Sequence, residues 1–518
     1  MLGGAVLAAL LAVAAPADPD AHHRASLELV YQGHLEAALT RLRAASAASP
    51  RDPMAGYVLA LALCWKVEQQ PESETLDRDL VAAAELAVSR ANAILAGDPG
   101  NVRALFARGA AHGALSRYHL FRLHRTDAAR SAVRMREDLT RVRSLEPAHE
   151  DASFGLGLYD YYADVLPRAA KVIRFLARIP GGNRVRGLST IETAAERPTL
   201  HHTEARVQLF DMYAFYEDRP SRAMDQLDDL RRRYRTHPLW ALRSAEHLRA
   251  RLGAYDDAVR IGREILARAA RGEENYKGKW VPALARLELG HALLSDLRPA
   301  EARPFLLAVA TEGIPGYAAA RGRARYLVGR TLELEGDRVG ALAHYRLAAG
   351  GPDDEWRQSA RAAIATPLSA SRVRALEALG EARRLREGKR LQESIPLARE
   401  ALQLWPESVE AALILAEDRL AQGDGAGARA AWPARDDRQR ADTPWLVAWE
   451  GLLEAERSDV EGRREDAVRQ YKKVLQEGFR RADLVKRAEA GIKGPLRPDR
   501  STPSVRSFHA ISTRLSTT

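Results

Sequence analysis

A pattern of paired helices that returns along most of the chain constrains its fold more than any other feature. In the clearest example, residues 326–332 form one apolar helical face, Gly336 interrupts it, and a second face begins at Ala341 and includes Tyr345. Small residues at Gly329 and Ala341 let the two helices approach closely, and a glycine turn permits a positive φ that other residues resist. The order of a turn glycine followed five residues later by alanine recurs at Gly33, Gly253, Gly423 and Gly462. The pattern therefore predicts successive pairs of antiparallel helices.

The register of the pattern gives the length of the repeat. Ala382 and Leu385 are followed 34 residues later by Ala416 and Arg419, and Ser394 is followed at the same distance by Ala428. A helix-turn-helix period of 34 residues is that of tetratricopeptide repeats, and the chain resembles this superfamily. The resemblance covers almost everything between residue 21 and about residue 479.

The resemblance implies an all-α fold, an α-solenoid of roughly eleven helical hairpins in a right-handed superhelix. The composition agrees, because the helix formers Ala, Leu, Arg and Glu dominate and strand-like runs are almost absent. The predicted order along the chain is a signal peptide at 1–17, degenerate N-terminal repeats with insertions at 18–200, a central array at 201–349, an insertion at 350–374, a C-terminal array with a capping helix at 375–494 and a disordered tail at 495–518.

The first residues are typical of an export signal. Leu2 to Ala15 is an uninterrupted run of apolar and small residues, and Ala15-Pro16-Ala17 supplies a small-residue cleavage site. The run is too short to span a membrane, and no later stretch reaches about 18 apolar residues. We therefore expect a periplasmic or secreted protein without a transmembrane segment in the mature chain, with peripheral envelope association possible. Because no Lys or Arg precedes the run, a cytoplasmic protein is the alternative.

The charge of the chain does not by itself indicate a nucleic-acid partner. The formal net charge is +10, but 69 acidic residues are interleaved with the 79 basic ones. The densest basic cluster, 231–235, directly follows Asp225, Asp228 and Asp229. We interpret it as a solvated helix end and expect no nucleic-acid binding.

Motifs for catalysis or metal binding are missing from the sequence. No Gly-x-Ser-x-Gly elbow, Walker lysine loop or Cys-x-x-Cys pair occurs. His201 and His202 are adjacent, and side chains that point about 100° apart on a helix cannot easily share an ion. His112, His119 and His124 have spacings of seven and five, which predict poor convergence. We expect no catalytic residue, no cofactor and no metal.

Three smaller features complete this part of the sequence. His22-His23 lies just past the predicted cleavage site and is expected to be mobile. Cys64 lies in an apolar run and is expected to be a packed core thiol. Because it is the single cysteine of the sequence, a disulfide framework is excluded. The acidic trio that begins at Asp353 is typical of a helix N-terminus, where carboxylates interact favourably with exposed amides.

The segment 154–190 carries a second, narrower resemblance. Its Gly155-x-Gly157 helix, Leu166-Pro167 step, amphipathic stretch 171–176 and Asn183-Arg184-x-x-Gly187-Leu188 turn are similar to a segment of a eukaryotic tetratricopeptide family linked to the mitochondrial outer membrane and to inclusion-body clearance. The resemblance implies a shared structural hairpin. No strand precedes the two glycines, so the pattern favours close helix packing over a phosphate-binding loop.

Three tyrosines in this segment are candidate partner contacts. Tyr159, Tyr161 and Tyr162 spread around a helix, so at least one is expected to be exposed and to contact a partner. Packing against the insertion at 166–183 is the alternative.

The superfamily's groove positions, carried over to this chain, define the remaining candidates for partner binding. They lie on the first helices of three repeats, and they are Arg323, Tyr326, Arg330, Leu379, Arg383, Arg386, Leu413, Glu417 and Leu420. The earlier positions are basic with apolar interruptions, which suits an acidic ligand or a C-terminal carboxylate, because arginine binds carboxylates in a bidentate way. A solvated groove without a dedicated ligand is the alternative.

Together these features predict a non-catalytic scaffold for protein–protein interaction, exported to the cell envelope, that binds other proteins or peptides through its concave groove. The alternatives are an accessory module that binds peptide or substrate for a secreted enzyme, and a cytoplasmic adaptor. An enzyme concealed in residues 150–200 has the least support, because nothing there arranges an acid, base or nucleophile.

Overall fold

The structure, a computed structural model, describes residues 20–70, 72–165, 180–432, 443–476 and 482–496. All regular elements in these ranges are helices. The predicted signal peptide at 1–17, the segment 166–179 and the predicted tail from 497 onward lie outside the described residues. The chain forms two compact units, one made of Met1–Gln69 and Ser73–His202, the other of Gln70–Glu72 and Thr203–Thr518.

The described helices of the first unit form four hairpins, and the two helices of each hairpin pack side by side. The pairs are α1 (Ala21–Tyr31) with α2 (Leu35–Ala48), α3 (Pro53–Gln69) with α4 (Glu74–Leu95), α5 (Val102–Phe121) with α6 (Arg125–Leu145), and α7 (Glu150–Val165) with α9 (Arg184–Glu196).

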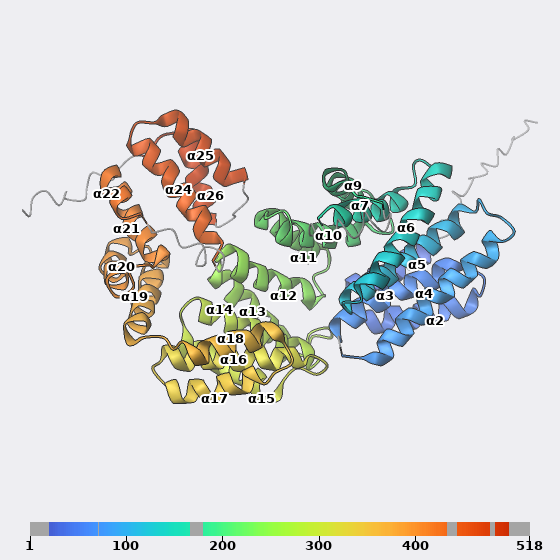
Figure 1. Cartoon of the computed structure of the whole chain (residues 1–518), viewed down its shortest axis with the longest axis horizontal. Coiled ribbons are helices and arrows are strands. Elements are labelled where there is room, and N and C mark those ends of the chain that lie inside the picture. The colour runs from blue at the N-terminus through green and yellow to red at the C-terminus, as the bar shows by residue number, and fades with distance from the viewer. Residues whose placement is uncertain (1–19, 71, 166–179, 433–442, 477–481, 497–518) are drawn as a thin grey trace, which may run out of the picture. The chain divides into compact units, whose positions relative to one another are not determined.

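The described helices of the second unit form seven pairs of the same kind (Figure 1). They are α10 (His202–Phe215) with α11 (Pro220–Arg233), α12 (Pro238–His247) with α13 (Tyr255–Ala270), α14 (Trp280–Ser295) with α15 (Pro299–Glu312), α16 (Ala318–Leu334) with α17 (Arg338–Ala349), α19 (Ala370–Glu387) with α20 (Leu391–Leu404), α21 (Val409–Ala421) with α22 (Gly425–Ala430), and α24 (Trp445–Val460) with α25 (Arg464–Gln476).

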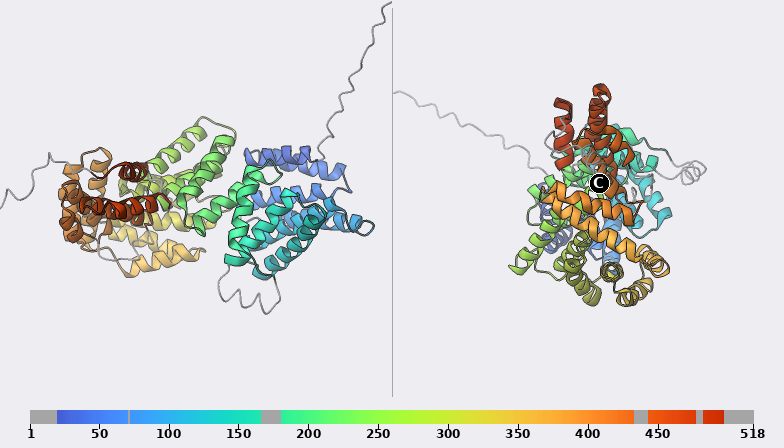
Figure 2. Two further views of the ribbon diagram at one scale, coloured as in Figure 1. Left: turned by 90° about the horizontal axis from the view of Figure 1, so that it is seen from above. Right: turned by 90° about the vertical axis from the view of Figure 1, so that its left-hand side faces the viewer.

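Three helical segments fall outside this pairing. A π-turn, η1 (Leu248–Leu252), extends α12; α18 (Asp354–Ala365) packs on α16 and α17; and α26 (Ala482–Lys493) packs on α24 and α25. Figure 2 shows the stacked pairs from two further directions. The described residues therefore confirm an all-α solenoid of helical hairpins, while the handedness of a superhelix stays a prediction.

The predicted hairpin turns have the expected conformation. Gly33, Gly253, Gly336, Gly423 and Gly462 all have positive φ, between 61° and 91°. In the hairpin of α16 and α17, a Cβ atom on Gly329 would lie 2.5 Å from the ring of Tyr345, which is fully buried. Close approach at Gly329 therefore requires glycine, as the sequence predicts.

The start of α18 also agrees with the sequence. Asp353 precedes the helix, and its side chain accepts hydrogen bonds from the main-chain amides of Glu355 and Trp356. The acidic trio is thus a helix N-terminus, in which a carboxylate satisfies amides that have no partner in the helix.

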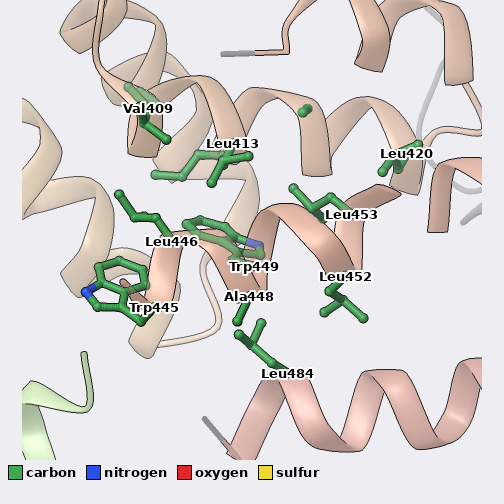
Figure 3. Close-up of a cluster of buried hydrophobic side chains, with 14 of the residues drawn as sticks. Val409, Leu413, Leu420, Trp445, Leu446, Ala448, Trp449, Leu452, Leu453 and Leu484 are labelled. Atoms are coloured by element: carbon green, nitrogen blue, oxygen red, sulfur yellow. The ribbon is translucent and has the colours of Figure 1, made fainter. Parts of the chain in front are cut away.

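The core of the second unit lies between consecutive hairpins. Figure 3 shows Leu413 and Leu420 of α21 facing Trp449 and Leu453 of α24, all of them buried. Leu484 of α26 belongs to the same cluster. Each hairpin thus buries apolar area against the next one, which is how repeats that cannot form a core alone become stable.

The structure corrects one sequence expectation near the N-terminus. His23 is not mobile but fully buried in α1, with its Nε2 3.3 Å from Asp52. Cys64 is buried in α3, as predicted.

In the part of the chain that the structure describes, no helix is both long and apolar enough to cross a membrane.

Candidate partner-binding surface

The three candidate tyrosines of α7 have different environments. Tyr161 is fully buried, and Tyr159 is buried with its hydroxyl donating to the carbonyl of Pro180 at 2.8 Å. Tyr162 alone of the three is half-buried. Tyr159 and Tyr161 are therefore not partner contacts, because they are buried where α7 meets Pro180 and α9.

The glycines of this segment serve helix packing. A Cβ atom on Gly187 would lie 2.6 Å from the main-chain nitrogen of Tyr161 and 2.7 Å from the carbonyl oxygen of Gly157. Backbone atoms cannot move aside as a side chain can, so α7 and α9 can cross this closely only with glycine at 187. This confirms close helix packing and excludes the phosphate-loop interpretation. The Leu166-Pro167 step and the stretch 171–176 lie outside the described residues.

His201 is a structural residue at the end of the first unit. Its Nδ1 lies 2.7 Å from Asp151, whose carboxylate also accepts from the main-chain amides of Leu200 and His201. Its Nε2 contacts the hydroxyl of Tyr57, and Phe154 stacks on the ring. Burial opposes the ionisation of Asp151, but the hydrogen bonds and His201 outweigh it and lower the pKa of this carboxyl.

The arginines predicted to bind an acidic ligand are already paired. Arg383 of α19 donates to both carboxylate oxygens of Glu410 on α21, at 2.7 and 2.6 Å, and to the carbonyl of Ser295 at 2.7 Å. Arg386 donates to Glu417 at 2.7 Å. The carboxylate partner of these arginines is therefore supplied by the next hairpin. Arg383 and Arg386 are not available to bind an acidic ligand, which contradicts the acidic-ligand hypothesis for these two residues.

Glu417 belongs to a wider buried network. It also accepts a hydrogen bond from the indole of Trp449 at 2.8 Å and lies 3.0 Å from Arg487 of α26. Burial alone would raise the pKa of Glu417, but Arg487 and Arg386 outweigh it and hold the pKa at about 2. Glu417 is thus a structural anion and not a partner contact.

The three leucines of the predicted groove are also corrected. Leu379, Leu413 and Leu420 are at most 2% exposed. The helix α21 is covered by α20, α22 and α24 together, so its apolar positions face neighbouring helices and not a partner.

The remaining candidates lie on α16, where the side chains are partly exposed. Arg323 donates to Glu288 and to Nδ1 of His291, both on α14 and both at 2.7 Å. Tyr326 lies 5.6 Å from the ring of Trp356 on α18. Arg330 pairs with Glu333 of its own helix at 3.1 Å. Arg323 and Arg330 are thus occupied, and the aromatic side chains are left at the surface.

Five partly or fully exposed side chains on successive elements of the second unit define what we call the central surface. They are Glu246 of α12, His291 of α14, Tyr317 before α16, Tyr326 of α16 and Trp356 of α18. Tyr317 is 37% exposed. Of these five residues, the sequence predicted only Tyr326 as a partner contact. Trp356 lies in α18, which falls within the predicted insertion at 350–374.

The central surface carries an unusual electrostatic pattern. The neighbouring helices partly desolvate the carboxylate of Glu246 although the residue is exposed, and this raises its pKa; the nearby carboxylate of Glu288 adds to the shift, while Arg323, Arg249 and Arg243 oppose it. Burial lowers the pKa of His291 well below its ordinary value, with Arg249 and Arg323 reinforcing the shift. The imidazole is therefore neutral at pH 7. Among the described residues Glu246 makes no ion pair, although Arg323, Arg249 and Arg243 act on it from a longer distance.

A second electrostatic feature lies where α19 ends. The carboxylates of Asp256, Asp296 and Glu387 have oxygen atoms within 4.8 Å of one another. Arg298 lies 3.5 Å from Asp296 and 3.7 Å from Asp256. Burial raises the pKa of Asp296 to about 6, with Arg383 opposing and Asp256 reinforcing the shift. Burial, with Asp296 and Asp256, raises the pKa of Glu387 to about 7.

We expect these shifts to make stability fall as the pH rises through 6 to 7. A carboxyl whose pKa is raised by folding stabilises the fold while it is protonated, and the contribution is lost on ionisation. Glu387→Gln should therefore raise the free energy of local unfolding of α19 at pH 8, measured by hydrogen exchange, by less than about 1 kcal/mol because Glu387 is exposed. The gain should vanish towards pH 4.5. Glu381→Gln, on the same helix but outside the cluster, is the control; an equal gain in this control would contradict the explanation.

Comparison with known proteins adds little to these observations. No protein-family model matches the chain, and no curated protein matches it. The structure is similar to the tetratricopeptide domain of P58(IPK), with 15% identity and a TM-score of 0.21 over 87% of this chain and 100% of that chain. It is also similar to Naa15/Naa10 bound to HypK, with 14% identity and a TM-score of 0.19 over 91% of this chain and 78% of that chain. The fold therefore rests on the hairpins described above.

Proposed function

We propose that the protein is a non-catalytic scaffold that binds another protein through the central surface. The observation that carries this proposal is the gathering of partly exposed aromatic side chains at α16 and α18, Tyr317, Tyr326 and Trp356, in the neighbourhood of the exposed carboxylate of Glu246 on α12. Stacked hairpins leave their first helices available along one face, and such faces hold extended peptides or partner helices.

The chemistry of the central surface favours a partner segment with a basic and an apolar side chain. Trp356 and Tyr326 offer large, rigid contact area at little cost in side-chain entropy, which is typical of energetically dominant interface residues. Glu246 is an exposed carboxylate that makes no ion pair among the described residues, so it is a suitable acceptor for a lysine or arginine of the partner. This replaces the acidic ligand that the groove arginines suggested.

Site-specific crosslinking tests the proposal. With p-benzoylphenylalanine in place of Tyr317, irradiation in the producing cell should join the chain to a small number of proteins, identified by mass spectrometry. The same group at Val339, which is 82% exposed on α17, is the matched control. Adding Glu246→Lys should reduce the Tyr317 adduct at least about tenfold, because it places like charges together.

Two outcomes would overturn the proposal. Adducts that are equally abundant from positions 317 and 339 would show that contact is non-specific. Adducts unaffected by Glu246→Lys would remove the central surface from recognition. Neither result would contradict the hairpin fold, which is established independently of the partner.

The proposal includes export to the cell envelope, with a cytoplasmic adaptor as the alternative. Its support is the apolar run from Leu2 to Ala15 and the cleavage site that ends at Ala17. A reporter that is active only outside the cytoplasm, fused after residue 25, tests this part separately. The likeness of 154–190 to a mitochondrial-membrane-linked family contributes a hairpin and no compartment.

A further inference from the structure

The turn between α5 and α6 brings two histidines and an aspartate together. His119 lies in the last turn of α5, His124 directly precedes α6, and Asp127 lies in the first turn of α6. One ligand atom of each side chain lies within 4.8 Å of the other two. The spacing in the sequence predicts poor convergence of the two histidines. That expectation is wrong, because the chain reverses at Leu123, whose φ is 59°.

Main-chain hydrogen bonds hold this turn without help from the three side chains. The amide of His124 donates to the carbonyl of His119 at 2.8 Å, and the amide of Ala128 donates to the carbonyl of His124 at 3.0 Å. The positions of the three residues are therefore set by the backbone of the hairpin. Only their side-chain torsions remain to be adjusted.

The side chains are also not used for helix capping. At the starts of α5 and α9, Asn101 and Asn183 accept main-chain hydrogen bonds, whereas His124 makes no such bond at the start of α6. Asp127 pairs with Arg130 at 3.0 Å, but both side chains are at least half exposed, and such pairs contribute little. Local helix chemistry therefore does not explain why these three groups converge.

His119 has a nitrogen that nothing in the described structure satisfies. Its Nδ1 is buried and has no hydrogen-bond partner. An imidazole nitrogen without a hydrogen bond is available as a metal ligand.

We propose that His119, His124 and Asp127 form a binding site for a divalent transition metal ion, with zinc as the best-suited member of the class. Imidazole and carboxylate groups are the ligands that zinc takes beside thiolates. Ligands about 2.1 Å from a tetrahedral ion lie about 3.4 Å apart, and the ligand atoms of the three residues already lie within 4.8 Å of one another, so small side-chain rotations of the exposed His124 and Asp127 suffice to close the site. Three protein ligands leave one position open to solvent or to a partner's side chain.

A second cluster in the same unit is a weaker candidate. His22, His23 and Asp52 also lie within 4.8 Å of one another. However, Arg103 is 3.3 Å from Asp52, and its guanidinium already neutralises this carboxylate. A metal ion would have to displace that cation, so this cluster serves as the internal control.

Zinc titration of the full chain, purified without a polyhistidine tag, tests the proposal. Competition with a chromophoric chelator should show one equivalent of zinc bound, and cobalt should give the visible bands of a tetrahedral site. Loss of an outer-shell group alone typically weakens metal binding 10- to 100-fold, so His124→Gln and Asp127→Asn should each weaken it at least about tenfold. His22→Ala, which removes a histidine from the second cluster, should bind zinc as the unchanged chain does.

Because His124 is exposed and Asp127 lies at the surface of the turn, their variants should keep the fold, and far-ultraviolet circular dichroism checks this. The proposal is overturned if the unchanged chain binds no zinc under these conditions. It is also overturned if His124→Gln and Asp127→Asn bind as tightly as the unchanged chain, or if His22→Ala is the variant that loses the ion.

Discussion

Replacing Arg383 with alanine is expected to destabilise the second unit by about 3 to 5 kcal/mol, because it leaves Glu410 charged, buried and without its partner. The side chains of Arg383 and Glu410 are only 14% and 10% exposed, and the guanidinium donates to both carboxylate oxygens. Burial opposes the charge on Arg383, but Glu410 outweighs it and raises the pKa of this arginine. The guanidinium of Arg383 therefore stays charged in the folded protein.

Hydrogen exchange is the suitable measurement, because long repeat arrays do not unfold in one cooperative step. Arg383→Ala should reduce protection in α19 and α21 and leave the first unit unchanged. Arg384→Ala is the matched control, since its partner Glu381 lies on the same helix and both are about half exposed. This control should cost less than about 0.5 kcal/mol.

A double variant separates the loss of a pair from the loss of packing. Arg383→Met with Glu410→Leu removes both charges, and it should recover most of the stability that Arg383→Ala loses, because no buried charge is left without a partner. If the double variant were as unstable as the single one, the side-chain volume of Arg383 would be decisive and not its charge.

Gly187→Ala is expected to destabilise the first unit by about 1 to 3 kcal/mol, the range for overpacking a tight core. The added Cβ would lie 2.6 Å from the main-chain nitrogen of Tyr161, so α7 and α9 would have to move apart. The midpoint of chemical denaturation, followed by exchange in α7 and α9, measures the effect.

Gly322→Ala is a control with the opposite sign. Gly322 lies inside α16, and a Cβ atom there meets nothing within 4 Å. Alanine should therefore stabilise α16 by up to about 1 kcal/mol through helix propensity. If both alanine variants changed stability in the same direction, the crowding at Gly187 would not be the cause.

The hairpin turns show how far the sequence leads and where it stops. The five turns that were predicted contain glycine. Four other hairpins reach the same left-handed conformation at Leu123, Asp218, Leu297 and Lys389. Each of these residues precedes a buried Ala or Ser by five positions, as the glycines do. A search for glycine misses these turns. A search for the small residue five positions after each turn would have identified them.

Local features of the chain were accessible from the sequence because they depend on residues close together along it. The helices, the glycine turns and the small residues at helix crossings each arise within one hairpin. The role of the groove residues was not accessible in this way. Arg383 and its partner Glu410 are 27 residues apart, and Arg386 and Glu417 are 31 apart.

By itself, then, the sequence determined the hairpins and their order, because backbone propensity and close packing of small residues act over one repeat. Only the tertiary structure decided which charges are satisfied and which side chains remain at the surface. The physical reason is that an arginine on a first helix has the same local pattern whether it faces solvent or a glutamate on the next hairpin. The stacking of the hairpins decides between these two cases. It buries Leu413 and leaves only 14% of the Glu417 side chain exposed, whereas Glu246 and Trp356 stay partly or fully exposed.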